Sequence, residues 1–419
     1  MPEFDFARLR RAPDVEAPNL QAWDATDDLL VRAALDAGLP GDEIAVIGEG
    51  YGAITLALAD AGMRGIRVHQ DLVTGRRALA RNAASLGLDG FESRELDEGL
   101  LTGIRLVLLQ LPKSLAELEE IADAIARWAA PDAVLIAGGR VKHMSLGQND
   151  VLGRYFGEVQ PQRAERKSRL LIARGPRRPA APPPFPVSTR HALPGETSTS
   201  ARDPRAEQGS RAEAGVSAGS RGEVGTSAHG LTLCAFGGAF AGDRIDIGTR
   251  VLLDVSSLRL APLAQHGARG RSLNDRGLTV IDLGCGTGAL AAAYALAHPA
   301  SRVIATDRSA AAVRSARATM AANGLENVTV TLDDAGSELP DHEADLILLN
   351  PPFHLGNAVD EAAGHRLIQA AARLTRPGGE VWTVFNSHLD HRRILQREVG
   401  PTEQIERTSK FIVTKSTRR

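Results

Sequence analysis

The sequence predicts an α/β protein in which one fold, with a mostly parallel sheet, occurs twice in tandem. Three observations lead to this prediction. Apolar strand-like runs alternate with helical patterns along most of the 419 residues, as in parallel sheets covered by helices. The same order of patterns recurs at an offset of about 235–240 residues, which indicates a duplicated domain. A Pro-, Gly-, Ser- and Arg-rich stretch separates the two copies.

This change in composition divides the chain into three parts. We expect a first domain over residues 1–174 and a second domain over residues 230–419. Residues 175–229 hold only a handful of large apolar side chains, too few to offset the entropy that ordering costs. We therefore predict a disordered linker at 175–229, and we favour a plain spacer over an RNA tether or a partner-binding motif.

The second block predicts the elements of the fold in order. A strand, a glycine-rich turn and a helix span residues 278–297, and the next strand spans 301–307. Asn-Gly closes the helix that follows, and Gly-Gly stops a later one. The remaining helices and strands are expected at 309–325, 328–334, 344–350, 360–379, 380–386 and 410–415.

The first block repeats this order with the same kinds of element. Chance similarity between Ala-rich segments is the alternative, but the nearly constant offset favours a true repeat. The segments that match the second block lie at 43–62, 65–71, 72–88, 104–114 and 114–139.

Composition excludes several classes of protein. The apolar fraction of 43% suffices for two cores, but no run approaches the ~20 apolar residues of a membrane-spanning helix. Cys234 and Cys285 cannot form a disulfide framework, and no CxxC pair suggests zinc. The first residues include acids and lack the apolar run of a signal peptide. We therefore expect a cytoplasmic monomer without a metal site and without membrane attachment.

A glycine-rich turn follows the first strand of the second block. Its pattern, D-x-G-x-G-x-G, consists of Asp282, Gly284, Gly286 and Gly288. Glycines let the backbone turn sharply and approach a ligand closely. The spacing differs from the G-x-G-x-x-G fingerprint that leaves room for a pyrophosphate. We predict that these four residues bind a ligand without phosphates.

Two acids follow the next strands of this block. Asp307 comes about twenty residues after the last glycine, where an acid can accept hydrogen bonds from both ribose hydroxyls of an adenosine. Asp334 ends the third strand, where it can reach an adenine amino group. A ligand with ribose and adenine but no phosphates is S-adenosylmethionine, which we predict as the cofactor. Helix capping or turn formation is the alternative role of each acid; in the first block, Asp71 occupies the position of Asp307.

The fourth strand of the second block ends in the tetrapeptide Asn350, Pro351, Pro352 and Phe353, at the edge where open α/β sheets bind ligands. The prolines make the backbone rigid, so the Asn350 side-chain oxygen and the Pro351 carbonyl can accept hydrogen bonds from a planar NH₂ group. Phe353 can stack on the ring that carries this amine. We predict that all four residues are catalytic, that their fixed acceptors stabilise positive charge on the nitrogen, and that Asn350 also borders the cofactor. His354 either contacts RNA or forms a structural hydrogen bond.

The first block carries altered copies of both motifs. We align Gly48 with Asp282 and Ile54 with Gly288, so that the acid and the last glycine are missing from the first block. The sequence Gln-Leu-Pro-Lys at 110–113 replaces the tetrapeptide and lacks both the ring and one proline. We expect the first domain to keep its fold, to lose its chemistry and not to hold the cofactor tightly.

These motifs resemble those of the bacterial rRNA guanine-N2 methyltransferases, which consist of two tandem Rossmann-like methyltransferase domains. The resemblance covers nearly the whole chain outside residues 175–229. It implies two class I methyltransferase folds, a degenerate first domain that helps to bind RNA, and S-adenosylmethionine-dependent methylation of guanine N2 in rRNA. The segments that carry it are GGAFAGDRIDIGTRVLLD at 237–254, VIDLGCGTG at 280–288, NPPFH at 350–354, NSHL at 386–389 and KFIVTK at 410–415.

This family has two branches, one acting on 16S rRNA and one on 23S rRNA. The segments LQLPKSLAELEE at 109–120 and ERKSRLLIAR at 165–174 resemble the 23S branch, typified by the large-subunit methyltransferase G. The resemblance therefore implies 23S rRNA or a ribosomal subunit precursor as the partner, with 16S rRNA as the alternative.

A group of basic residues lies near the end of the first domain. Such a cluster could neutralise RNA phosphates, and the alternative is an ordinary solvated face before a linker. Its members are Arg163, Arg166, Lys167, Arg169 and Arg174, with Arg140 and Lys142 nearby in the sequence.

Other functions fit the sequence less well. Glutamine-N5 methyltransferases of proteins also use an Asn-Pro-Pro-aromatic motif, but it usually ends in Tyr and their partner domain is a small helical bundle. A non-catalytic binding module does not explain the intact motifs of the second block. Methylation of cytosine C5 needs a nucleophilic cysteine at the tetrapeptide, and neither cysteine lies there.

Overall fold

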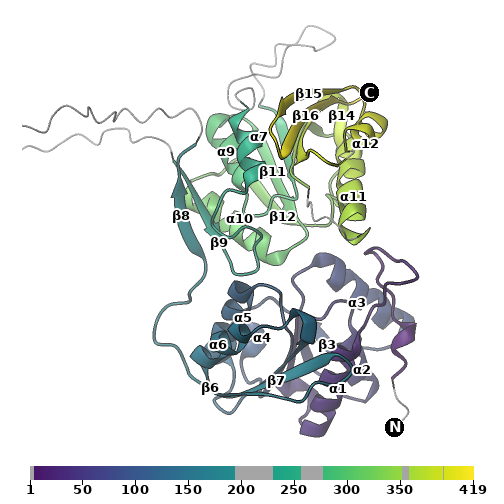
Figure 1. Cartoon of the computed structure of the whole chain (residues 1–419), viewed down its shortest axis with the longest axis vertical. Helices are drawn as coiled ribbons and strands as arrows, with labels where there is room; N and C mark the ends of the chain where they lie inside the picture. Colours follow the sequence, from purple (N-terminus) through teal and green to yellow (C-terminus); the bar gives the residue numbers. More distant parts are fainter. Residues whose placement is uncertain (1–3, 194–229, 256–276, 352–357, 390) are drawn as a thin grey trace, which may run out of the picture.

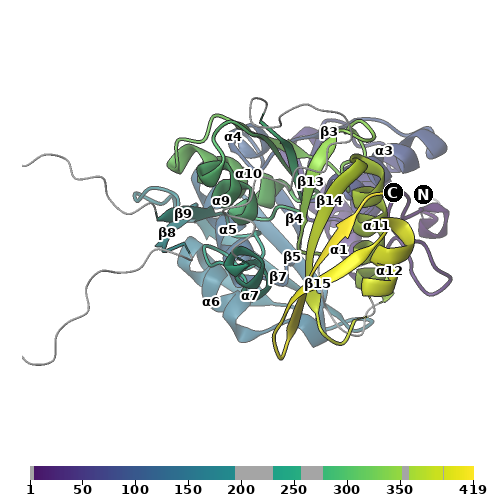
Figure 2. The ribbon, with the colours of Figure 1, turned by 90° about the horizontal axis from the view of Figure 1, so that it is seen from above.

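The computed structural model describes residues 4–193, 230–255, 277–351, 358–389 and 391–419. Two seven-stranded sheets, each with helices on both faces, form two domains that lie one above the other (Figure 1). Seen from above, the second domain covers the first, and the strands β8 and β9 lie at one edge of the molecule (Figure 2). The predicted duplication of an α/β fold is confirmed.

The first domain follows the predicted alternation of strands and helices. Its sheet has the order β3-β2-β1-β4-β5-β7-β6, with β7 antiparallel to its neighbours. The strands are β1 (Ile44–Ile47), β2 (Ile66–His69), β3 (Phe91–Ser93), β4 (Leu106–Gln110), β5 (Val134–Arg140), β6 (Phe156–Pro161) and β7 (Ser168–Pro176). The helices are α1 (Ala25–Ala37), α2 (Ala53–Asp60), α3 (Val73–Leu86), α4 (Glu98–Leu101), α5 (Leu115–Trp128) and α6 (Leu146–Tyr155), with 3-10 turns at Phe6–Arg8, Gly41–Glu43 and Val141–His143.

The second domain repeats this topology with the sheet order β12-β11-β10-β13-β14-β16-β15. Its strands are β10 (Thr279–Leu283), β11 (Arg302–Asp307), β12 (Val328–Leu332), β13 (Ala344–Leu349), β14 (Thr375–Asn386), β15 (Thr402–Arg407) and β16 (Phe411–Thr417). Its helices are α7 (Ile247–Asp254), α9 (Ala289–Ala297), α10 (Ala310–Ala322), α11 (Ala358–Leu374) and α12 (His391–Glu398).

The strand order reverses between β10 and β13, which lie side by side at the centre of the second sheet. Both strands are buried on both faces; Val280 and Leu346 pack on one side and Ile281 and Ile347 on the other. Loops that leave such a reversal diverge to opposite sides of the sheet, so a crevice opens at the carboxyl ends of the strands. Any ligand site of this domain is expected there.

A two-stranded sheet of β8 (Val187–His191) and β9 (Leu231–Ala235) lies at the edge of the molecule. Because β8 lies within 175–229, the prediction of disorder is wrong for residues 187–191. The side chains of β8 are mostly exposed, so composition gave no sign of a strand that forms through backbone pairing with buried β9. The rest of the predicted linker from residue 194 onward lies outside the described residues.

Helix α10 anchors β9 through side chains spaced one turn apart. Ser315, Thr319 and Asn323 accept hydrogen bonds from backbone N–H groups in and just after β9, at 2.9–3.0 Å. These side chains supply the acceptors that a neighbouring strand would otherwise provide. The polar positions inside an otherwise Ala-rich helix are therefore explained by the strand that they hold.

The segment after β9 docks against α5 of the first domain. The Gly237 N–H donates to the Glu120 carboxylate at 2.7 Å, and the Ser114 hydroxyl donates to the Gly237 carbonyl at 3.3 Å. Arg314 forms an ion pair with Glu120 at 2.9 Å and lies over the Phe236 ring. These polar contacts fix the separation of the two domains.

Among the described residues, no helix combines the length and the apolar character that crossing a bilayer requires.

The first prediction concerns this docking contact. A Cβ at Gly237 would lie 2.3 Å from the Ala116 carbonyl oxygen, a backbone atom of the other domain. Gly237→Ala should therefore separate the domains and lower the free energy of unfolding by about 1–3 kcal/mol, as measured by urea denaturation. Gly153→Ala in α6 is the matched control: a Cβ there meets no atom within 4 Å, and the helix should gain up to ~1 kcal/mol. Equal stability of Gly237→Ala and wild type would show that the contact is not tight.

Candidate active site

A cavity of about 480 Å³ lies at the carboxyl ends of β10, β11 and β13 in the second domain. This volume falls within the ~300–1,000 Å³ of pockets that enclose small-molecule ligands. Of the residues predicted from sequence, those that line it are Asp282, Gly284, Gly286, Asp307, Asp334, Asn350 and Pro351. Pro352, Phe353 and His354 lie outside the described residues, so the structure says nothing of the predicted stacking ring.

The glycines of the turn have two different tasks. Gly286 adopts a left-handed φ of 53°, and a Cβ there would meet no protein atom within 4 Å, so its backbone is open to a ligand. Gly288 also has a positive φ, of 79°, but a Cβ there would lie 2.7 Å from the Met320 side chain. Gly288 does not line the cavity; its lack of a side chain lets α9 pack against α10.

The two acids beside this turn are held by backbone donors. The Asp307 carboxylate accepts hydrogen bonds from the N–H groups of Gly286 and Ser309, both at 2.9 Å. The Asp282 carboxylate accepts one from the N–H of Ala291 in α9, also at 2.9 Å. Burial raises the pKa of both groups, and it raises that of Asp282 to about 7. Burial thus disfavours the charged forms of both carboxyls in the cavity, and a cationic ligand bound beside them would favour those charged forms.

Asn350 is oriented by two side chains from α7 and its N-cap. Its Nδ2 donates to Asp246 Oδ2 at 3.1 Å and to Thr249 Oγ1 at 2.9 Å. Both amide N–H groups are thereby engaged, and the side-chain oxygen remains as the acceptor. Asp246 itself also accepts from the first backbone N–H groups of α7, so this orientation is built into the helix start.

Several residues of the site are not predicted from the sequence. Asp246 and Thr249 belong to the quoted DIGT segment, but no spacing rule links them to a residue about 100 positions later. Arg366 of α11 pairs with Asp334, with Nη1 3.4 Å from Oδ2. The other missed residues that line the cavity include Phe240, Arg244, Asp333, Asn386 and Phe411.

The structure corrects the alignment of the two glycine-rich turns. Gly52 and Gly288 both precede a helix, with left-handed φ angles of 92° and 79°. A Cβ at Gly52 would lie 2.6 Å from the Leu79 side chain in α3, and a Cβ at Gly288 would lie 3.1 Å from Ala316 in α10. The two glycines are therefore equivalent. The first domain keeps the last glycine, contrary to the expectation that Ile54 replaces it.

With this alignment, Gly48 corresponds to Gly284, and the two share φ angles of 79° and 78°. Val46 of β1 then stands where Asp282 stands in β10. The expected loss of the acid holds, although the residue that replaces it is Val46 and not Gly48. The glycine framework is kept in the first domain because the helix packing needs it, while the acid at the strand position of Asp282 is replaced by Val46.

The equivalent crevice of the first domain is filled by its own side chains. The buried Glu49 carboxylate accepts hydrogen bonds from the N–H groups of Ile54 and Thr55 at 2.9 and 3.1 Å and from the Thr55 hydroxyl. Gln70 donates to the carbonyls of Glu49 and Gly50. The remaining cavity is about 40 Å³, room for only a few water molecules. These contacts support the expectation that the first domain does not hold the cofactor.

The replacement of the tetrapeptide also has an internal partner. Gln110 of β4 donates to Asp27 Oδ1 at 2.6 Å, where Asn350 in the second domain donates to Asp246 and Thr249. Residues of the second domain, among them Ala310 and Arg314, close the small cavity from outside. The first domain has thus become a docking surface at the edge that serves as a ligand site in the second.

The basic cluster near the end of the first domain is less uniform than the sequence suggests. Arg166 pairs with Asp28, and Arg169 is half-buried. Arg163, Lys167 and Arg174 are exposed, and within the described part of the chain no ion pair engages any of the three. Lys142 is also exposed and has no ion pair among the described residues, whereas Arg140 lies 4.0 Å from Asp24. The exposed cations without an ion pair are the ones available for phosphates.

Comparisons with known proteins agree with this geometry. The family model "RLMG N-terminal domain" matches residues 2–177, and "Methyltransferase small domain" matches residues 230–415. A protein of Ectopseudomonas mendocina named ribosomal RNA large subunit methyltransferase G is 32% identical over 429 aligned positions that cover 100% of both chains. This chain belongs to the ribosomal RNA large subunit methyltransferase G family. The resemblance inferred from the motifs is confirmed, and the protein is an enzyme, a methyltransferase.

Other members and one solved structure extend this result. The ribosomal RNA large subunit methyltransferase G of Streptomyces avermitilis is 31% identical and covers 98% of this chain and 97% of its own. The Thermus thermophilus 16S rRNA N2 G1207 methyltransferase, solved with AdoMet and guanosine, has a TM-score of 0.70 at 20% identity and covers 97% of both chains. The fold of that structure matches the fold of this chain over both domains.

The second prediction concerns the raised pKa of Asp282. Its pKa of about 7 in the folded state exceeds the 3.8 of an exposed carboxyl, so the folded chain binds this proton more tightly. The resulting stability is present at low pH and is lost as the pH rises from about 4 to about 7. Wild type should therefore lose stability relative to Asp282→Asn over this range, as measured by urea denaturation without ligand. Parallel pH profiles would mean that Asp282 keeps an ordinary pKa.

Proposed function

We propose that this enzyme transfers the methyl group of S-adenosylmethionine to the exocyclic N2 amino group of a guanine in 23S rRNA. The observation that carries this proposal is the orientation of Asn350 at the cavity. Its N–H groups are held by Asp246 and Thr249, so the remaining oxygen is an acceptor suited to an aromatic amino group. Such an acceptor stabilises the positive charge that develops on nitrogen during methyl transfer.

The residues around the cavity fit the cofactor. In this proposal, Asp307 accepts hydrogen bonds from the ribose hydroxyls and Asp334 accepts one from the adenine amino group; both acids line the cavity. Asp282 and the turn through Gly284 and Gly286 adjoin the rest of the cavity, and the buried carboxylates complement a cationic sulfonium. S-adenosylmethionine, when bound, supplies an electrophilic methyl group.

The chain supplies position and electrostatics to the reaction. Asn350 and the carbonyl of buried Pro351 accept hydrogen bonds from the guanine amino group and turn the nitrogen lone pair toward the methyl carbon. The new N–C bond forms as the S–C bond breaks, and the amino nitrogen then gives up a proton to water. No strong base is assigned, because the nitrogen sheds this proton readily once it is methylated and cationic. The predicted stacking of the base on Phe353 is part of this proposal.

The choice of 23S rRNA rests on the relatives, whose names specify the large ribosomal subunit. The first domain adds a second RNA-binding surface, since A-form RNA is recognised largely through phosphates and shape. Methylation of a guanine in 16S rRNA is the nearest alternative. Methylation of a protein glutamine is disfavoured because the partner domain is a second α/β fold and not a helical bundle.

The third prediction tests the chemistry. Asn350→Ala removes the oriented acceptor, so single-turnover methyl transfer should slow by ~10²–10³-fold while the affinity for S-adenosylmethionine stays close to that of wild type. The assay measures N2-methylguanine in 23S rRNA, and in 16S rRNA in parallel, by mass spectrometry of nuclease fragments. Gln110→Ala, the equivalent change in the first domain, is the matched control and should leave the rate unchanged. Near-normal transfer by Asn350→Ala would remove this residue from the mechanism.

The fourth prediction concerns RNA binding by the first domain. Replacing Arg163, Lys167 and Arg174 by Ala should weaken rRNA binding and reduce its salt dependence, by roughly one unit of slope per lost phosphate contact. Arg166→Ala should change the slope little, because Asp28 already pairs with that charge. RNA affinity across a salt series gives the slopes, and S-adenosylmethionine affinity is measured alongside as an internal control. Coinciding slopes of wild type and triple variant would assign these residues to a solvated face.

A further inference from the structure

The first domain reaches the cofactor cavity of the second through the start of α3. The Asp71 carbonyl accepts a hydrogen bond from the Ala310 N–H at 2.9 Å, and the Asp71 carboxylate accepts one from the Ala311 N–H at 2.8 Å. In return, the Val73 N–H donates to the Arg308 carbonyl at 2.9 Å. Asp71 therefore satisfies two of the backbone donors that the first turn of α10 leaves without partners inside the helix.

These bonds fix the loop that carries Asp307. Arg308 and Ser309 connect Asp307 to α10, and both ends of this two-residue link are fixed, since Asp71 and Val73 hold the chain on one side and the Asp307 carboxylate accepts from the Ser309 N–H on the other. A shift of the first turn of α10 would move that donor and turn the carboxylate away from the ribose position. Asp71 also lines the cavity, so the contact lies at the ligand site itself.

Helix α3 of the first domain also holds the loop that carries Asp334. Arg77 of α3 donates to the carboxylates of Asp333 and Glu338 at 2.9 and 2.7 Å and to the Ser337 hydroxyl at 3.0 Å. The Asp333 side chain is only 2% exposed, and removal of the cation beside such a carboxylate is costly. Arg77 thus joins three residues of the loop that begins immediately after β12.

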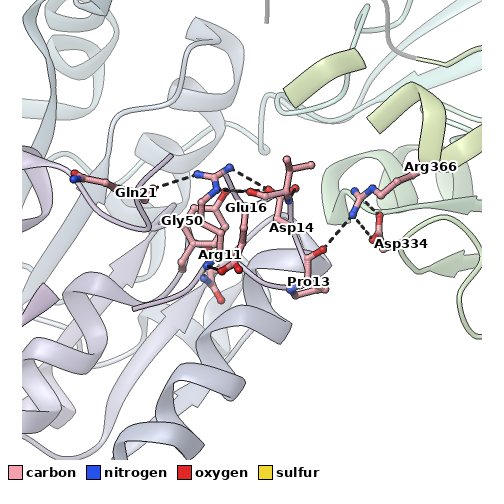
Figure 3. Close-up of polar contacts among 11 residues, drawn as sticks. Arg11, Pro13, Asp14, Glu16, Gln21, Gly50, Asp334 and Arg366 are labelled. Atoms are coloured by element: carbon pink, nitrogen blue, oxygen red, sulfur yellow. Dashed lines mark hydrogen bonds and ion pairs between the residues drawn. The ribbon is translucent and has the colours of Figure 1, made fainter. Parts of the chain in front are cut away.

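A third contact comes from the N-terminal segment of the first domain (Figure 3). The Pro13 carbonyl accepts from Arg366 at 3.2 Å, and the same guanidinium pairs with Asp334. Arg11 ties this segment into a compact loop by donating to the carbonyls of Val15 and Gln21. The N-terminal segment that contacts Arg366 is therefore itself held in place within the first domain.

We propose that the first domain sets the affinity of the second domain for its cofactor, with Asp71 and Arg77 as positioning residues for Asp307 and Asp334. Asp71 corresponds to Asp307 in the duplicated fold. In this proposal it does not bind a ligand but holds the loop that carries Asp307. This inference rests on the proposed S-adenosylmethionine site and adds that residues of the first domain hold part of that site in place.

The fifth prediction tests this role in the full-length chain. Asp71→Ala should raise the Kd and the KM for S-adenosylmethionine roughly three- to tenfold, the usual size of a lost helix cap, with kcat unchanged at saturating cofactor. Asp71→Asn keeps an oxygen acceptor for the Ala311 N–H and should restore most of the affinity. A loss in Asp71→Asn as large as in Asp71→Ala would overturn the proposal, because it would mean that the charge acts directly on the ligand.

Two controls separate positioning from general stability. Asp97 caps α4 within the first domain, and Arg105 pairs with Asp132 and Glu43 there. Asp97→Ala and Arg105→Ala should lower the Tm without changing the KM for S-adenosylmethionine, whereas Arg77→Ala should raise this KM as Asp71→Ala does. Unchanged KM values in both Asp71→Ala and Arg77→Ala would refute the inference. Calorimetry on wild type tests the underlying site: absence of S-adenosylmethionine binding there would refute the proposed function instead.

Discussion

The first turn of a helix leaves backbone N–H groups without partners inside the helix. The packing of the two domains depends on the acceptors that these N–H groups of α3 and α10 find. These helices occupy the same place in the two copies of the fold, and their starts meet at the domain interface, where each donates to the chain that precedes the other. The two domains therefore join at the very edge where each copy could have admitted a ligand. Among the described residues, the large cavity lies in the second domain and the small one lies beneath the interface.

In the crevice of the first domain, polar side chains bond to groups of the domain itself. Buried polar atoms require partners, so a crevice that no longer admits a ligand must provide its own. Glu49 now reaches the helix start that Asp282 serves in the other copy, and Gln110 donates to Asp27. Neither change alters the backbone, since the glycines that set the turn are still required for helix packing. The two domains thus share one backbone fold and differ in single side chains at the crevice.

The sequence alone predicts the repeated α/β fold and seven of the residues that line the cavity, because strand periodicity, glycines and strand-end acids are local signals. It does not reveal that Thr249 orients Asn350 or that Asp71 holds α10, since these pairs join distant segments and involve common helix-capping residues. It also misaligned the two turns by two residues, because Gly48, Gly50 and Gly52 alternate with other residues and a shift of two still pairs glycine with glycine until backbone angles and contacts are compared. Strand β8 escaped prediction because its pairing uses backbone groups, which leave little trace in composition.

The pairing of β8 with β9 changes the meaning of the chain between them. His191 and Leu231 face each other across this ladder, so the two ends of the segment between them lie side by side, and the length of that segment does not set the distance between the domains. The entropic free-energy cost of closing such a loop rises by only about 0.6 kcal/mol when its length doubles. The chain between His191 and Leu231 can therefore change in length or sequence at little thermodynamic cost. A whole reporter protein inserted there should leave the register of both sheets unchanged.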